Sequence, residues 1–258
     1  MCSVIFFDRI NHHNERIVHH TAAGILQKKI ELYEVIDLKK QLIKIMPLRS
    51  WAMLTIIFSV NCAVYFGTRL FTAGFKHYSI VSPLDRNLPF VPIFISIYLL
   101  AYIQWITGFI MIGREEQAAI RVFTGELIAK GIALICFIFL PTTIEELRRP
   151  VMESLQGGGI WCELTAWIYS VDAADNCFPS VHCLESWICF RGALKLKKVP
   201  WWYKYLMLVM TLLVFASTVF VKQHVLIDIL GGVAAVEIGL LCSGRLQLRR
   251  LRGEKGGT

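Results

Sequence analysis

The sequence predicts an all-α integral membrane protein, a six-transmembrane helical bundle with an N-terminal amphipathic helix. Three observations support this fold class. Hydrophobic residues make up 55% of the 258 positions, and the mean hydropathy is +0.55. Several apolar runs also approach the roughly 20 residues that a helix needs to cross a bilayer. A soluble core of this size would not need such runs.

Residues 1–50 form a separate cytoplasmic segment. Between Thr21 and Met46, apolar residues recur at helical spacing among lysines, and the pattern ends before Pro47. It predicts a basic amphipathic helix that lies along the anionic inner leaflet. Two histidine pairs here have no Cys or acidic residue at metal-ligand spacing, so we interpret them as solvated. The segment lacks the cleavage site of a secretory signal, and we expect it to be retained.

Residues 51–243 form the predicted membrane domain, and residues 244–258 form a basic cytoplasmic tail. The third and fourth spans are the least regular, because the third contains Glu126 and Lys130 and the fourth contains His182 and Glu185. Glu126 and Lys130 are four residues apart and can neutralise each other on one helix face. The six predicted spans are about Trp51–Leu70, Pro89–Gly113, Val122–Leu140, Pro179–Leu196, Tyr203–Val221 and His224–Cys242.

The distribution of positive charge predicts the orientation of the spans. With a cytoplasmic N-terminus, the inside segments hold 20 Lys and Arg residues and the outside segments hold six, while Lys130 lies within a span. The positive-inside rule therefore places both termini in the cytoplasm, and we expect the plasma membrane. The net charge of +8 belongs to the cytoplasmic membrane faces. No soluble surface with basic residues among aromatics is visible, so nucleic acid is not an expected partner.

The segment from Pro141 to Cys177 is long for a loop in a compact membrane bundle. It contains an arginine pair, a glycine tract and an aromatic stretch with Trp161, Trp167 and Tyr169. Because Trp and Tyr favour bilayer interfaces, we expect a short helix at the external surface rather than a seventh span. Taken alone, the two arginines are also compatible with ordinary interfacial residues.

The eight cysteines are scattered and form no CxxC unit, which argues against a zinc or redox module. Cys162 and Cys177 both fall in the predicted external loop. They either form a disulfide there or remain two free thiols at the membrane interface.

His224 and Asp228 are the most informative residues, because they are four positions apart and share one face of a helix. The Asp228 carboxylate can then hold one ring nitrogen of His224 and leave the other free to react. His182, in the run Phe178–His182, supplies a proton donor. Together these residues provide a nucleophile, its orienting group and an acid without a metal. Each residue alone is also compatible with a structural role.

The predicted topology brings these groups to one side of the membrane. His182 opens the fourth span and His224 lies between the fifth and sixth spans, so both fall at the external surface. Arg148, Arg149 and Lys222 are three of the few external cations, and they fall in the same layer. An anionic substrate explains such cations better than topology does.

Three segments together resemble the type 2 phosphatidic acid phosphatase superfamily, and most closely its inositol phosphorylceramide and sphingomyelin synthase-like branch. The first is Pro141–Thr143 with Leu147–Pro150. The second, Pro179–His182, reads Pro-Ser-x-His, and the third, Ser217–Asp228, reads Ser-x6-His-x3-Asp. The likeness covers about residues 94–232 and leaves the N-terminal segment outside.

Two positions depart from the family pattern. The first motif usually begins with a lysine seven residues before the arginine, where this chain has Thr142. The arginine that usually follows the third-motif serine is replaced by Thr218. The resemblance implies that Arg149 anchors phosphate, with Arg148 as the alternative, and that Lys222 supplies the missing cation. The hydroxyls of Ser180 and Ser217 are suited to bind the same oxygens.

The resemblance also implies the reaction. His224 would form a phosphohistidine, Asp228 would fix its tautomer, and His182 would protonate the leaving alkoxide, with no metal or other cofactor. We therefore expect a membrane lipid phosphate phosphatase with an extracytoplasmic site and a phospholipid or other lipid phosphate as substrate. Two alternatives stay open. One is a head-group phosphotransferase of the inositol phosphorylceramide and sphingomyelin synthase type, and the other is a non-catalytic lipid-phosphate binding or transport protein.

Overall fold

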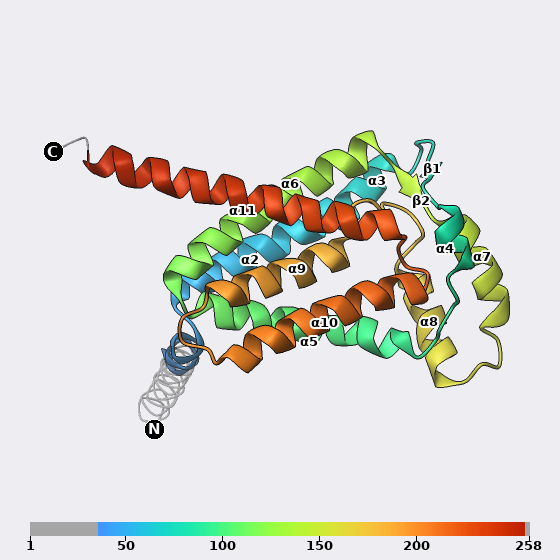
Figure 1. The fold of residues 1–258 in the computed structure, drawn as a ribbon, viewed down its shortest axis with the longest axis horizontal. Coiled ribbons are helices and arrows are strands. Elements are labelled where there is room, and N and C mark those ends of the chain that lie inside the picture. Colours follow the sequence, from blue (N-terminus) through green and yellow to red (C-terminus); the bar gives the residue numbers. More distant parts are fainter. Residues whose placement is uncertain (1–35, 256–258) are drawn as a thin grey trace, which may run out of the picture. The chain divides into compact units, whose positions relative to one another are not determined.

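The computed structural model describes residues 36–255, and for residues 248–255 only the backbone (Figure 1). The chain up to Leu48 and the chain from Arg49 form separate compact units, so each is described by itself. In the first unit, residues 36–45 are helical. The rest of the amphipathic helix predicted between Thr21 and Met46 lies outside the described residues, as do both histidine pairs. That helix therefore stays a prediction.

Within the described residues, five helices are long and apolar enough to cross a membrane. They match the first, second, third, fifth and sixth predicted spans, which supports an integral membrane protein. The first is composite, because a π-helical turn, η1 (Ala63–Gly67), separates α2 (Leu48–Cys62) from α3 (Thr68–Thr72). The others are α5 (Phe94–Gly113), α6 (Glu116–Phe139), α10 (Trp201–Phe220) and α11 (Leu226–Lys255).

The fourth predicted span is a helix, α9 (Val181–Lys195), but its 15 residues are fewer than the roughly 20 that a bilayer requires. The count of six spans therefore stays a prediction. Helix α9 packs against α5, α6, α10 and α11 (Figure 1). Neighbouring helices thus surround it and shield its polar residues from lipid.

Shorter elements gather at one end of the second unit (Figure 1). Strand β1 (Tyr78–Ser79) pairs in parallel with β2 (Thr142–Thr143). Helix α4 (Pro83–Asn87) begins with a capping box, in which the Ser82 and Asp85 side chains bond each other's backbone amides. Two further helices follow β2, namely α7 (Glu145–Ser154) and α8 (Ile160–Val171). The 12-residue α8 confirms the short helix predicted around the aromatic stretch.

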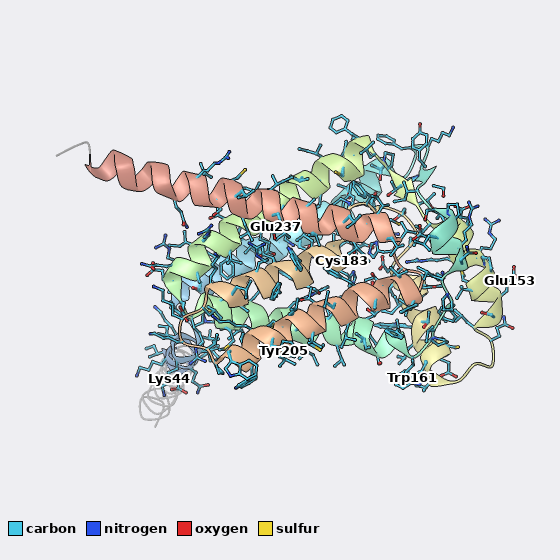
Figure 2. All side chains as sticks on the ribbon, in the orientation of Figure 1. Lys44, Glu153, Trp161, Cys183, Tyr205 and Glu237 are labelled. Atoms are coloured by element: carbon cyan, nitrogen blue, oxygen red, sulfur yellow. The ribbon has the colours of Figure 1, made fainter. Side chains whose placement is uncertain are left out.

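Large apolar side chains cover much of the outer surface of the spanning helices (Figure 2). Leu70, Phe139 and Trp201 are each at least 75% exposed. Soluble monomers rarely expose apolar surface so extensively, because water contact with it is unfavourable. A lipid environment removes that cost and agrees with the membrane assignment.

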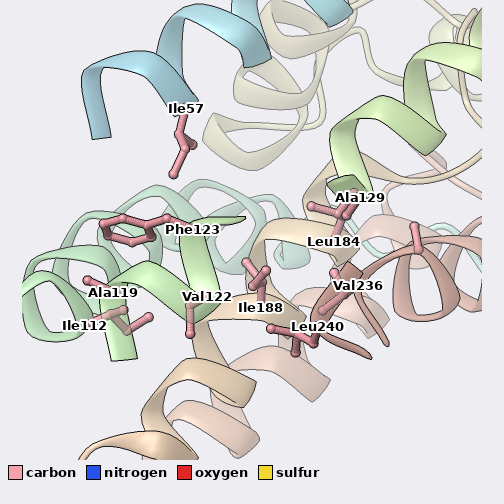
Figure 3. Close-up of a cluster of buried hydrophobic side chains, with 11 residues drawn as sticks. Ile57, Ile112, Ala119, Val122, Phe123, Ala129, Leu184, Ile188, Val236 and Leu240 are labelled. Carbon is pink, nitrogen blue, oxygen red and sulfur yellow. The ribbon is translucent and has the colours of Figure 1, made fainter. Parts of the chain in front are cut away.

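The core between α6, α9 and α11 contains buried apolar residues, including Phe123, Ile188 and Val236 (Figure 3). Helices α6 and α11 approach each other closely at two glycines, Gly125 and Gly239. A Cβ atom added at Gly239 would lie 2.1 Å from the Gly125 carbonyl oxygen. Small residues permit this close helix contact in membranes, where packing rather than hydrophobic burial drives association.

We therefore expect Gly239→Ala to destabilise the bundle by about 1–3 kcal/mol, the usual cost of overpacking. The measurement is thermal unfolding of the purified protein in detergent. Gly131→Ala on the same α6 is the matched control, because its added Cβ would meet no atom within 4 Å. Equal unfolding temperatures for the two variants would contradict the close contact.

Candidate functional site

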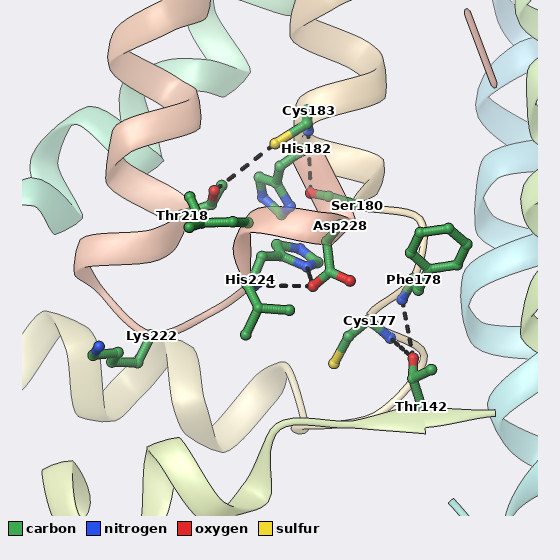
Figure 4. Close-up of polar contacts among 12 residues, drawn as sticks. Thr142, Cys177, Phe178, Ser180, His182, Cys183, Thr218, Lys222, His224 and Asp228 are labelled. Atoms are coloured by element: carbon green, nitrogen blue, oxygen red, sulfur yellow. Dashed lines mark hydrogen bonds and ion pairs between the residues drawn. The ribbon is translucent and has the colours of Figure 1, made fainter. Parts of the chain in front are cut away.

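The segment before α9 is fixed by hydrogen bonds at both of its ends (Figure 4). The Thr142 hydroxyl accepts from the amides of Cys177 and Phe178 at 3.1 and 3.0 Å. Ser180 caps α9, since its hydroxyl accepts from the Cys183 amide at 3.2 Å. These bonds fix the backbone on both sides of the Pro179 turn and so fix His182, the second residue of α9.

The segment before α11 is fixed by the end of α10. The Thr218 carbonyl accepts from the amides of both Gln223 and His224, at 2.9 and 3.0 Å. Lys222, the residue before Gln223, adopts a left-handed conformation with φ 52°, in the position after a helix end where glycine is common. Helix α11 begins at Leu226, so the sixth span starts two residues later than predicted and His224 lies in the turn before it.

The predicted contact between His224 and Asp228 is present (Figure 4). His224 Nδ1 lies 3.1 Å from Asp228 Oδ2, which also accepts from the Val225 amide at 3.0 Å. Asp228 is fully buried, and its Oδ1 has no hydrogen-bond partner among the described residues. The carboxylate therefore caps the start of α11 and orients the imidazole.

His182 lies opposite, with its ring centre 6.1 Å from that of His224. Its ring stacks on Tyr98 at 4.2 Å, and its Nδ1 lies 3.3 Å from the Tyr98 hydroxyl. The Nε2 atom is buried and has no partner within residues 36–255. One nitrogen of the ring is thus held, while the other is free for a ligand.

Asp172 extends the contact between His182 and Tyr98 to a carboxylate. Its Oδ2 lies 3.3 Å from the Tyr98 hydroxyl, and its Oδ1 accepts a hydrogen bond from Tyr65. The two histidines are thus each linked to a carboxylate, His224 directly and His182 through Tyr98. Sequence reasoning missed Tyr98 and Asp172, because no motif contains them and a tyrosine in an apolar span has an ordinary packing role. An aspartate close before the second motif was the only available signal.

The two neighbouring arginines differ in their surroundings. Arg148 is 3% exposed, donates to the carbonyls of Asp172 and Lys222, and lies 4.6 Å from the ring centre of Tyr169. Arg149 has a 73% exposed side chain whose nearest acid is Glu145, at 3.8 Å. Of the two predicted alternatives, only Arg148 reaches the histidines' cavity.

Lys222 points away from the two histidine rings (Figure 4). Its Nζ donates to the carbonyls of Asp85 and Leu88, at 2.9 and 2.7 Å. Burial lowers the pKa of its ammonium, and nearby Asp85 offsets part of this effect. Burial alone would raise the pKa of Asp85, but hydrogen bonds from Ser82 and the Leu226 amide hold it below its usual value. Both charges thus brace the turn before His224 against α4.

The two predicted serines have local partners instead of facing the cavity. The Ser180 hydroxyl caps α9, and the fully buried Ser217 hydroxyl donates to the Val214 carbonyl at 2.7 Å. Cys162 and Cys177 are both free thiols that belong to different buried clusters. Among the described residues, no three His, Cys, Asp or Glu side chains are grouped to hold a metal ion.

Both histidines line a cavity of about 390 Å³. Its polar lining includes Arg148, Gln223 and two carboxylates that already have partners, Asp172 with Tyr65 and Tyr98 and Asp175 with Arg69. Aromatic residues form much of the remaining wall, namely Phe58, Tyr65, Phe66, Tyr98, Tyr102 and Trp105. A cavity with cationic and imidazole groups beside an aromatic wall is suited to an anionic group attached to an apolar body.

The fold and the cavity define a helical membrane protein with a paired-histidine site. The chain belongs to the PAP2 superfamily, whose family model matches residues 72–242. This confirms the predicted superfamily, whose members are generally phosphatases or phosphotransferases, and indicates activity of that type on lipid phosphates. Both histidines and Asp228 lie inside the matched region. No curated protein and no solved structure matches the chain.

Proposed function

We propose that this protein is a membrane lipid phosphate phosphatase that acts through a phosphohistidine at His224. The observation that carries the proposal is the pair of histidines that face one cavity. Each has one ring nitrogen linked to a carboxylate, which leaves the opposite nitrogen to react. This is the arrangement that a nucleophile and a general acid require.

In the first half-reaction, His224 Nε2 attacks the phosphorus and the bond from phosphorus to the lipid oxygen breaks. Protonated His182 gives its Nε2 proton to that oxygen, so a neutral lipid alcohol leaves. The proton on His224 Nδ1 stays in place and is donated in a hydrogen bond to Asp228. The negative charge of this carboxylate stabilises the cationic phosphohistidine. Arg148 neutralises charge on the phosphoryl oxygens and takes the role expected of Arg149.

In the second half-reaction, a water molecule attacks the phosphohistidine. His182, now neutral, accepts a proton from this water, and the bond between phosphorus and His224 Nε2 breaks. Inorganic phosphate leaves, and both histidines regain their starting protonation states. The sum is hydrolysis of one phosphate ester bond with no net change in the enzyme.

The aromatic wall supports a lipid as the substrate. Phe58 and Phe66 lie on the composite first span, while Tyr102 and Trp105 lie on α5. An acyl or prenyl chain entering between these spans would lie against their rings and leave its phosphate at the histidines. An alcohol in place of water would give the head-group transfer expected of the synthase-like branch, since the first half-reaction is the same.

Replacement of the nucleophile is the direct test of the function. Purified parent protein in detergent is expected to release phosphate from a lipid phosphate or diphosphate without added divalent metal. His224→Ala should reduce this release at least about 10³-fold, because nucleophile and acid act as one unit. His77→Ala, a histidine outside the cavity, is the matched control.

Mass spectrometry of the lipids, with and without candidate alcohols, identifies the acceptor in the same incubation. Suitable substrates are phosphatidate, phosphatidylglycerophosphate, a polyprenyl diphosphate and a phosphorylated sphingolipid. Transfer of the phosphoryl group to an added alcohol, seen as a new phosphate ester of that alcohol in place of inorganic phosphate, would identify a transferase instead of a phosphatase. Full activity of His224→Ala would refute the nucleophile assignment, and anion binding without turnover in the parent would favour the non-catalytic alternative.

Tyr98 and Asp172 position the general acid. We assign a hydrogen bond from His182 Nδ1–H to the Tyr98 oxygen and a second one from the Tyr98 hydroxyl to Asp172. These bonds leave His182 Nε2 free to protonate the leaving group. Tyr98→Phe removes this acceptor and should lower kcat by about 10- to 100-fold, part of the roughly 10²- to 10⁴-fold that acid–base catalysis contributes.

The pH profile separates this role from simple packing. Loss of the acceptor destabilises the protonated ring of His182, so this ring loses its proton at a lower pH. The basic limb of the pH–kcat profile should therefore move to lower pH in Tyr98→Phe. Tyr102→Phe is the matched control, since its ring also lies near His182, at 6.0 Å, and it should leave that limb in place. Equal profiles for both variants would contradict the positioning role.

The proposed orientation places the cavity on the extracytoplasmic face, with both termini in the cytoplasm of a plasma-membrane protein. Gln156, between α7 and α8, and Lys197, between α9 and α10, are both exposed. A Gln156→Cys variant should react with an impermeant thiol reagent in intact cells, and Lys197→Cys should not, after subtraction of parent labelling. The reverse pattern would place the chemistry in the cytoplasm.

A further inference from the structure

The third motif lacks a cation beside the nucleophile, although phosphoryl transfer requires donors on the non-bridging oxygens. Thr218 stands where the resemblance implies an arginine, and its hydroxyl donates to the Phe215 carbonyl. Lys222, the expected substitute, is occupied by the carbonyls of Asp85 and Leu88. Another group next to His224 must supply the donor.

Gln223 fills this position. It directly precedes His224, is 2% exposed and lines the cavity together with both histidines. Its Nε2 has no hydrogen-bond partner within residues 36–255. A buried amide donor left unpaired costs about 1–3 kcal/mol, and a ligand oxygen in the cavity would remove that cost.

The turn holds Gln223 in a fixed relation to the nucleophile. The backbone amides of Gln223 and His224 share the Thr218 carbonyl, and the side chain of Lys222 braces the same turn against α4. A side chain presented on such a turn loses little freedom when it binds a ligand, which favours binding of the phosphoryl oxygens.

Arg148 supplies the charge that a neutral amide lacks. Its Nε and Nη1 donate to Lys222 and Asp172 carbonyls, and its Nη2 has no partner among the described residues. The guanidinium is therefore held in one plane, beside the Tyr169 ring, with one nitrogen left for a ligand. The Lys222 carbonyl joins this arginine to the turn that carries Gln223.

We propose that Gln223 and Arg148 form an oxyanion cradle that binds the non-bridging oxygens of the phosphoryl group attacked by His224. This proposal rests on the proposed function for its substrate class and adds Gln223 as a binding residue. The cradle takes any tetrahedral oxyanion of this size, so inorganic phosphate and orthovanadate are suitable probes without a lipid.

The test is equilibrium binding of orthovanadate to the purified full chain in detergent, measured by calorimetry alongside thermal unfolding without ligand. Gln223→Met keeps the length of the side chain and removes the donor. Its orthovanadate affinity should fall about 10- to 100-fold, the loss expected for one hydrogen bond to a charged group. Gln223→Glu should bind more weakly still, because it places a negative charge on the oxyanion. Gln156→Met, an exposed glutamine, is the matched control.

The outcomes separate this proposal from the proposed function. Weaker binding by Gln223→Met at an unchanged unfolding temperature supports the cradle even if no lipid phosphate is hydrolysed. Turnover with unchanged orthovanadate affinity in Gln223→Met and Gln223→Glu would overturn the cradle and leave the phosphatase proposal standing. No orthovanadate binding by the parent chain would also contradict the cradle.

Discussion

The two histidine segments are joined by one hydrogen bond, from the Ser180 amide to the Asp228 carbonyl at 3.1 Å. Close packing at Gly232 permits this bond, because a Cβ atom there would lie 2.8 Å from the Ser180 carbonyl oxygen. The start of α9 and the start of α11 are therefore held together at backbone level. This contact sets the 6.1 Å distance between the histidine rings on which the proposed chemistry depends.

Charged residues inside the bundle strengthen the same arrangement. Lys130 on α6 contacts Glu185 on α9, lies 3.4 Å from Glu126 and donates to Asn61 at 2.7 Å. Isolated charges are costly in a membrane, but grouped charges of opposite sign offset much of that cost. The cluster ties the short α9 to the longer α6 and to the first span. It also extends the predicted pairing of Glu126 and Lys130 to a third helix.

Hydropathy and motif spacing were sufficient for the coarse fold and for the contact of His224 with Asp228. Five apolar segments appear as helices long enough to span, and His224 contacts Asp228, because both features depend on local sequence. The cations could not be assigned in the same way. Arg148 and Arg149 are adjacent on a helix, so only the rotation of α7 decides which one faces the cavity. Lys222 is turned away by a left-handed backbone conformation, which a lysine rarely adopts and which no local pattern predicts.

Tyr98, Asp172 and Gln223 show a different limit of sequence reasoning. The role of each depends on contacts across the bundle, and although Gln223 precedes His224 and Asp172 lies close before the second motif, no motif position specifies their residue types. The proposed roles of Tyr98 and Asp172 follow from the hydrogen bonds that link them to His182. The proposed role of Gln223 follows from its buried amide nitrogen, which has no partner among the described residues. In physical terms, motifs record the groups that react, whereas the groups that hold them are specified by packing.

The central claim is that His224 becomes covalently phosphorylated during turnover. The most direct measurement is a rapid alkaline quench of the protein with a lipid phosphate, followed by proteolysis and mass spectrometry of the peptides. We predict a phosphoryl group on the Nε2 nitrogen of His224. Phosphate release with the phosphoryl group on another residue, or with none on the enzyme, would contradict the account.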